Sequence, residues 1–204
     1  MSNGNLQVGR VLRAGTRGFA IGCAVMQPDI PAFGTFVRAE GLRPGSAIYG
    51  LIYDVSVEDD PFVRQLISAQ VHEPEVVLDN RENRQVPIEV SVLAVGASQG
   101  GEDGGEHIYH CLPAQPPVTL DWLYQCTDEE VRAFTARFDY FRLVLETRDV
   151  PADELLAASL RVAAAARPED ERETFLIEAA REMVKLLASD PVRLEGLLHR
   201  IRTP

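Results

Sequence analysis

The spacing of apolar residues changes once along this chain of 204 residues, at a proline-rich segment that begins at Pro113. Before that point apolar residues alternate with others, as in Phe19, Ile21 and Cys23, which is the period of a strand with one buried face. From Val131 onward they recur every third or fourth residue, which is the period of an amphipathic helix. The sequence therefore predicts an α+β protein with strands first and helices second.

Short apolar segments separated by glycine and proline predict about six strands in the first part. They lie at 6–13, 17–27, 33–40, 46–57, 86–96 and 107–112, with a glycine-rich acidic loop at 97–106 and a short helix at 62–70. The segment 46–57 is the longest, and Gly50 at its centre predicts either a barrel corner or a point where another backbone comes close. Short strands at this spacing are typical of a small barrel or a β-sandwich, and of these we expect a small closed β-barrel.

Three prolines between Pro113 and Pro117 predict an extended linker at 113–118, because proline blocks helices and central strands. The predicted domains are a barrel at 1–112 and a helical domain at 119–204. Thr127 and Glu130 have the spacing of a capping box, which predicts a helix start followed by one helix that reaches Leu145. Three further helices, at 151–167, 169–188 and 190–201, complete a predicted helical bundle.

Composition excludes some classes of protein. The three cysteines form no CxxC pair, and the N-terminus lacks the apolar segment of a signal peptide, so we expect a cytoplasmic protein without disulfides, cofactor or membrane span. The net charge of −11 disfavours nucleic acid as a partner. The first 53 residues are nonetheless net positive, and their arginines are candidate nucleic-acid contacts: Arg10, Arg13, Arg17, Arg38 and Arg43.

Two groups of side chains have the chemistry of metal ligands. The first is the acidic end of the 46–57 strand, with Asp54, Glu58 and Asp60; carboxylates two apart share a strand face, although Asp59, Asp60 and Pro61 also suit the start of a short helix. The second is His107, His110 and Cys111, with Cys126 as a distant fourth ligand. On a strand His110 would point away from the other two, which favours a structural role for this group.

The front of the chain resembles the HAS barrel, the small β-barrel shared by HerA-type DNA-translocating ATPases and F-type ATP synthase subunits. The resemblance covers about 60 residues well, within 7–66, and its matching positions are Gly9, Phe19, Gly34, Val37, Gly50 and Ile52. It implies a barrel that takes part in subunit assembly, since the barrels of those ATPases form a collar around a ring.

The chain departs from that family after the barrel. A P-loop needs a lysine within a glycine-rich loop, and the only lysine here, Lys185, has no glycine nearby, which excludes a P-loop ATPase. We therefore expect a non-enzymatic interaction module that docks on a HerA-like ATPase or on copies of itself. Two alternatives stay open: a DNA-processing accessory that uses the N-terminal arginines, and a metal-dependent hydrolase that uses the acidic end of the 46–57 strand.

Overall fold

The computed structural model describes residues 6–25, 31–57, 68, 86–101 and 105–202. Its strands are β1 (Gln7–Ala14), β2 (Gly18–Val25), β3 (Phe36–Glu40), β4 (Ser46–Val57), β5 (Val86–Gly100), β6 (Glu106–Tyr109) and β7 (Trp122–Gln125). Its helices are α3 (Asp128–Phe134), α4 (Tyr140–Leu145), α5 (Ala152–Ala165), α6 (Glu169–Leu186) and α7 (Pro191–Arg202). The helix predicted at 62–70 lies outside the described residues, apart from Ser68. None of the described helices is long and apolar enough to span a membrane.

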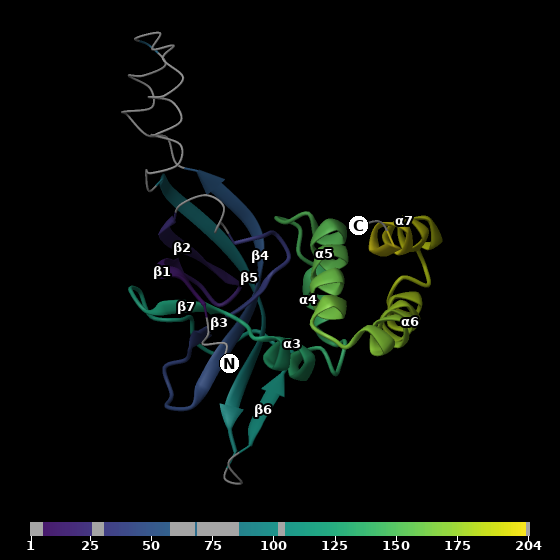
Figure 1. Ribbon diagram of the computed structural model, residues 1–204, viewed down its shortest axis with the longest axis horizontal. Helices are drawn as coiled ribbons and strands as arrows, with labels where there is room; N and C mark the ends of the chain where they lie inside the picture. The colour runs from purple at the N-terminus through teal and green to yellow at the C-terminus, as the bar shows by residue number, and fades with distance from the viewer. Residues whose placement is uncertain (1–5, 26–30, 58–67, 69–85, 102–104, 203–204) are drawn as a thin grey trace.

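Six antiparallel strands close into a barrel in the order β1–β2–β5–β4–β3–β7 and back to β1 (Figure 1), which confirms the predicted architecture. The long strand β5 pairs with β2, with β4 and, through its last residues, with β6. Strand β6 therefore extends the sheet beyond the barrel rather than closing it.

The barrel extends beyond residue 112, where its predicted end lies, because β7 follows the proline-rich segment 113–118 and belongs to the barrel. It pairs with β1 through Gly9 and Leu123 and with β3 through Ala39 and Leu123. The prolines therefore lead the chain back to the gap between β1 and β3. The helices begin only after β7, not at residue 119.

Strand β4 is buried on both faces because it separates two cores. Ile48 and Ile52 point into the barrel, where an apolar cluster includes Val11, Val90 and Leu123. Tyr49 and Leu51 point outward, and helices cover them. Gly50 fits the predicted close approach, since a Cβ there would overlap a methyl group of Val92.

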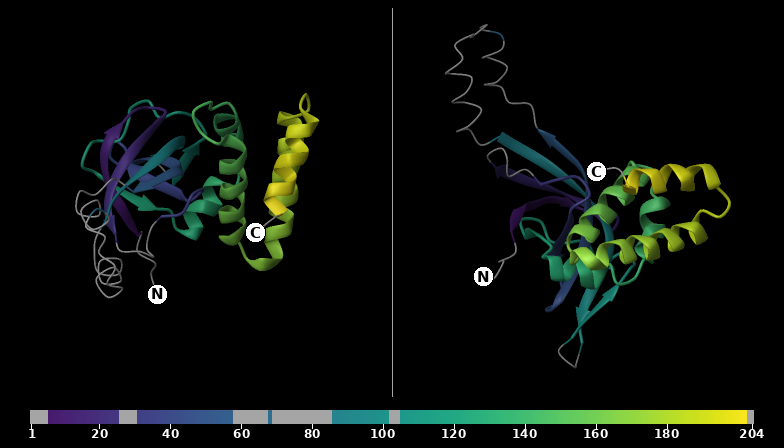
Figure 2. Two further views of the ribbon diagram at one scale, coloured as in Figure 1. Left: turned by 90° about the horizontal axis from the view of Figure 1, so that it is seen from above. Right: turned by 45° about the vertical axis from the view of Figure 1, so that its right-hand side comes forward.

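The helices pack on the outer face of β3, β4 and β5 and continue the second core. Helices α3, α4 and α5 lie next to the barrel, while α6 and α7 lie on the far side of α5 (Figures 1 and 2). Phe36 of β3 contacts the rings of Phe134 and Tyr140 at centroid distances of 5.8 and 6.2 Å. Barrel and helices thus share one apolar core.

The prediction of a single helix from Thr127 to Leu145 is wrong, because the chain forms two short helices with a break at 135–139. The break lets aromatic side chains face two different neighbours. Phe134 packs on Tyr49 of the barrel at 4.9 Å, whereas Phe138 packs on Phe175 of α6 at 5.6 Å. A straight helix would direct this apolar stripe to one side only.

Candidate functional site

The acidic end of β4 is only partly within the described residues. Asp54 is exposed on the strand, while Glu58, Asp59 and Asp60 lie outside the described part of the chain. Within that part, no group of three His, Cys, Asp or Glu side chains is placed to hold a metal ion.

The His and Cys residues of the second metal candidate do not come together. His107 on β6 is exposed, and so is Cys111, whereas His110 is buried with 5% of its side chain accessible. The fourth candidate, Cys126, is buried next to Phe36, whose carbonyl accepts a hydrogen bond from its backbone N–H. Burial raises the pKa of the Cys126 thiol, which disfavours the thiolate form of this side chain.

The contacts of His110 indicate a structural role rather than metal binding. Its Nε2 lies 2.9 Å from the carbonyl oxygen of Phe134, at the C-terminal end of α3, and its ring packs against Phe134 and Tyr140. Burial is the main cause that lowers the pKa of His110. The neutral ring thus ties the segment after β6 to the helices.

Three of the five predicted nucleic-acid arginines have partners within the fold. The guanidinium of Arg13 forms a bidentate ion pair with Glu89 of β5, and the hydrogen bonds from Arg13 lower the pKa of Glu89. Arg38 of β3 pairs with Glu130 of α3 at 2.5 Å. Arg10 lies 4.0 Å above the ring of Trp122.

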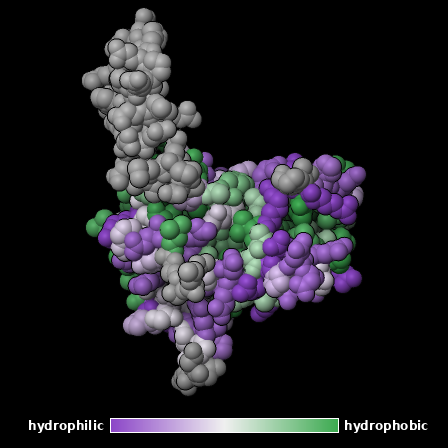
Figure 3. Space-filling view, viewed as in Figure 1, coloured by the Kyte–Doolittle hydropathy of each residue, from purple (hydrophilic) through white to green (hydrophobic). Residues whose placement is uncertain are grey.

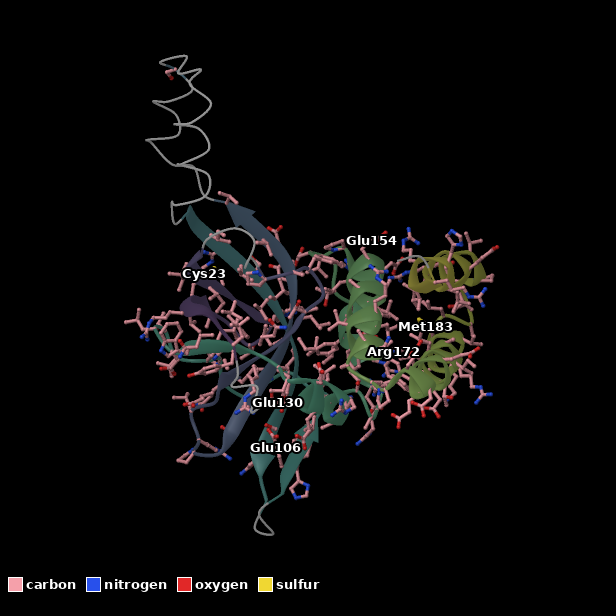
Figure 4. The ribbon with its side chains drawn as sticks, in the orientation of Figure 1. Cys23, Glu106, Glu130, Glu154, Arg172 and Met183 are labelled. Carbon is pink, nitrogen blue, oxygen red and sulfur yellow. The ribbon has the colours of Figure 1, made fainter. Side chains whose placement is uncertain are left out.

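The Arg38 pair lies where helix α3 meets the barrel. Glu130 also accepts a hydrogen bond from the backbone N–H of Thr127 at 2.8 Å, so the same carboxylate completes the capping box and holds Arg38. Nearby, Glu106 accepts hydrogen bonds from Tyr49 and Ser98. Figure 4 labels Glu106 and Glu130. These contacts fasten α3 and β6 to the barrel.

Arg17 and Arg43 are exposed. Arg43 and Arg38 line a pocket of about 380 Å³ at one end of the barrel, together with the carboxylates Glu40 and Glu106. The mixed charges of this pocket do not form the continuous positive surface that a nucleic-acid backbone requires.

The outer surface of β1 and β7 carries the most unusual group of side chains, here called the β1–β7 face: Arg10, Leu12, Val118, Leu120 and Trp122. Because Val11 points into the barrel, its neighbours Arg10 and Leu12 point outward. Leu12 lies over Gly22 of β2, where a Cβ would be 3.0 Å from its methyl group. The packed helices cover the opposite side of the barrel, so none of the described helices covers this face (Figure 1).

Leu120 lies in the turn before β7 and has a φ of 73°, in the left-handed region. Among the residues that the structure describes, it is the only one besides glycine with positive φ. Its backbone N–H donates to the carbonyl of Val11 at 2.8 Å, and its own carbonyl accepts from the Arg10 guanidinium at 2.7 Å. A leucine in this conformation costs roughly 1–2 kcal/mol relative to an ordinary backbone conformation.

Leu120 gains little burial in return, because the residue is 68% exposed. Leu12 and Val118 beside it are 48% and 41% exposed. Apolar atoms are visible at this edge of the barrel over the turn before β7 (Figure 3). The face thus combines backbone strain, exposed apolar side chains and an arginine stacked on a tryptophan.

Sequence reasoning misses this face because it interprets 113–118 as a linker. The available signal is the alternation in Trp122, Leu123 and Tyr124, which is that of a short strand. Positive φ at Leu120 has no sequence signal, since leucine disfavours that conformation.

No protein-family model matches the chain, and a search of curated proteins finds no match either.

Proposed function

We propose that this protein is a non-enzymatic interaction module and that its β1–β7 face binds another protein. The observation that carries the proposal is Leu120, which is held in a strained conformation by one hydrogen bond to the Val11 carbonyl and one from the Arg10 side chain, yet is 68% exposed. Strained residues persist where the surrounding structure holds them, and they concentrate at functional positions.

The chemistry of the face suits a protein partner. Exposed leucines provide apolar area, and the Arg10–Trp122 pair adds two of the three residue types that most often dominate binding energy at interfaces. A partner that covers Leu12 and Leu120 would remove apolar surface from water, at about 25 cal/mol for each Å².

We further propose that the barrel is of the HAS type and that the partner is a HerA-like ATPase. Support comes from the closed six-stranded barrel and from two of the matching glycines. At Gly9 a Cβ would lie 2.5 Å from the carbonyl oxygen of Gly22, and at Gly50 it would meet Val92, so both positions need glycine for barrel packing.

Cross-linking in the source cell followed by mass spectrometry tests the proposal. We expect the wild-type chain to capture a protein that Leu120→Ala captures at least about tenfold less, which corresponds to about 1.4 kcal/mol. Leu42→Ala is the matched control, because Leu42 is 55% exposed in another turn. Equal capture by the two alanine variants would contradict docking through Leu120, and absence of a HerA-like ATPase among the captured proteins would contradict the choice of partner.

The nucleic-acid alternative would depend mainly on the exposed Arg17 and Arg43. DNA binding with a steep salt dependence that is lost in Arg17→Ala/Arg43→Ala would favour it over protein docking. The hydrolase alternative depends on Glu58 and Asp60, outside the described residues, and stoichiometric metal in the purified protein would favour it.

A further inference from the structure

We propose that the β1–β7 face also binds a second copy of this chain, which presents its helix α6, so that copies associate head to tail. This inference rests on the proposed function of the β1–β7 face. It is carried by the chemistry of α6, which complements that face, and by the positions of the two surfaces in the molecule.

One side of α6 is acidic at its start and apolar further along. Asp170, Glu173, Ile177, Arg181 and Val184 follow one another at steps of three, four, four and three residues, so they share one side of the helix, here called the α6 face. Exposed Arg181 adds a positive charge between the two apolar side chains, so the negative charge of this face is confined to its start. Both carboxylates are exposed, and Ile177 and Val184 are 45% and 48% exposed. The opposite side, with Phe175, Ala179 and Met183, is buried in the core.

The basic residue within this acidic start does not neutralise the α6 face. Arg172 turns back toward the end of α5, and its Nε donates to the carbonyl of Arg167 at 3.0 Å (Figure 4). The first turns of α6 therefore present Asp170 and Glu173 to solvent. They offer negative charge next to apolar side chains.

The β1–β7 face offers the reverse charge next to leucines. Arg10 lies on the face and Arg17 in the adjoining turn, while Arg13 beside them is already paired with Glu89. Arg10 and Arg17 thus match Asp170 and Glu173 in number and oppose them in sign. The exposed Leu12 and Leu120 correspond to the exposed Ile177 and Val184.

No molecule can bring its own two surfaces together, because the barrel face and α6 lie at opposite ends of the structure, with the barrel and α5 between them (Figures 1 and 2). The contact must therefore join different copies. Since the two surfaces differ, the association is heterologous, and it produces a ring or an open chain rather than a two-fold dimer.

Sedimentation velocity of the full chain over a range of concentrations tests this proposal. In about 10 mM salt we expect the weight-average mass to rise with concentration to at least about twice the 22.5 kDa monomer, and to return to the monomer in about 0.5 M salt, where charges are screened. A chain that stays monomeric in low salt overturns the proposal.

Two variants then assign the surfaces. Leu12→Ser/Leu120→Gly removes the leucines of the barrel face, and its glycine suits the positive φ at residue 120, so the fold is retained. Asp170→Lys/Glu173→Lys reverses the charge of the α6 face at exposed positions. The control Glu146→Lys/Asp149→Lys makes the same change of charge elsewhere on the surface and should associate as the wild type does.

Each of the two variants alone should be monomeric, because each lacks one of the two surfaces. Mixed together, they should form a heterodimer and nothing larger, since only one complementary pair of intact surfaces remains. Association of either variant by itself, a mixture that stays monomeric, or a control that fails to associate each overturns the proposal. If the wild-type chain does not self-associate but still captures an ATPase through Leu120, self-association is overturned and the proposed docking function stands.

Discussion

Leu120 combines backbone strain with an exposed apolar side chain, a combination that lowers stability in two ways. Its turn is nevertheless well defined, since hydrogen bonds from Leu120 to Val11 and from Arg10 to Leu120 hold both sides of the residue. A turn formed by glycine at this position would be more stable. The cost of leucine is therefore consistent with a function for its side chain.

Replacement of Leu120 by glycine should raise the free energy of unfolding by about 0.5–1 kcal/mol, because relief of strain outweighs the added freedom of the unfolded chain. Urea denaturation followed by circular dichroism measures the change. Leu120→Ala is the control, since alanine keeps most of the strain and should give no gain. A glycine variant less stable than the alanine variant would contradict the assignment of strain.

His110 should make the protein less stable in acid. Its pKa is lowered by burial, against the opposing effects of the Phe134 carbonyl and of Asp139, whose carboxylate lies 3.8 Å from Nδ1. The unfolded imidazole binds a proton near pH 6.5 and the folded one only at lower pH, so the unfolded state binds more protons between these values. Stability is therefore retained above about pH 6.5 and is lost as the pH falls through the folded-state pKa.

Urea denaturation at about pH 7.5 and about pH 5.5 measures this contribution. The loss of stability between the two values should be smaller in His110→Gln, whose amide can still donate to the Phe134 carbonyl but does not titrate in this range. His107→Gln, at an exposed position, is the control and should lose as much stability as the wild type. If His110→Gln lost as much stability as the wild type between these pH values, the assignment of the acid sensitivity to His110 would be wrong.

Helix α5 approaches the start of β3 so closely that only glycine fits between them. Gly34 has a φ of +83°, and a Cβ there would lie 2.5 Å from the Cβ of Ala158. Gly34→Ala should therefore cost about 2–5 kcal/mol, from backbone strain and from overpacking together.

Gly45 provides the comparison, because it has a φ of +73° but a Cβ added to it would have no neighbour within 4 Å. Gly45→Ala should cost only the backbone strain, about 1–2 kcal/mol. The difference between the two variants in thermal or urea denaturation measures the packing of α5 on the barrel. Equal costs would show that α5 can move away from the barrel at little expense.

The elements differ in how well sequence patterns predict them. The capping box of α3 forms as predicted, with Thr127 and Glu130 each accepting a hydrogen bond from the other's backbone N–H. Strand β4 has the predicted bounds because its residues are apolar on both faces. Strand β7 escapes prediction because it has only four residues and its partners lie in β1 and β3, far away in sequence.

The candidate site shows the same limit at the level of single residues. The positive charge of the N-terminal part is evident from sequence, whereas the pairing of Arg13 with Glu89 and of Arg38 with Glu130 depends on contacts between distant strands and helices. The same is true of His110, whose burial results from the packing of α3 and α4.

At the scale of the whole molecule, barrel and helices should unfold together, because β4 contributes one face to each core. Trp122 is the only tryptophan and reports on the barrel, while circular dichroism reports mainly on the helices. Leu156→Ala in α5 removes a fully buried side chain and should lower stability by about 2–5 kcal/mol.

Although Leu156→Ala changes a helix, it should shift both unfolding transitions to the same midpoint, the fluorescence transition of the barrel and the circular dichroism transition of the helices. Leu143→Ala, at a partly exposed helical position, is the control and should shift both transitions less. Separate midpoints in Leu156→Ala would mean that the barrel remains folded without its helical cover.

The sequence alone determined that strands precede helices, where a helix is capped and that Gly50 needs glycine, since each of these depends on neighbours within a few residues. Only the tertiary structure decided that β7 closes the barrel, that one predicted helix breaks into α3 and α4, and that Leu120 is exposed in a strained turn. Arg10, which binds the carbonyl of Leu120, is separated from it by 110 residues. No local pattern carries such a contact, because it forms only when the barrel closes.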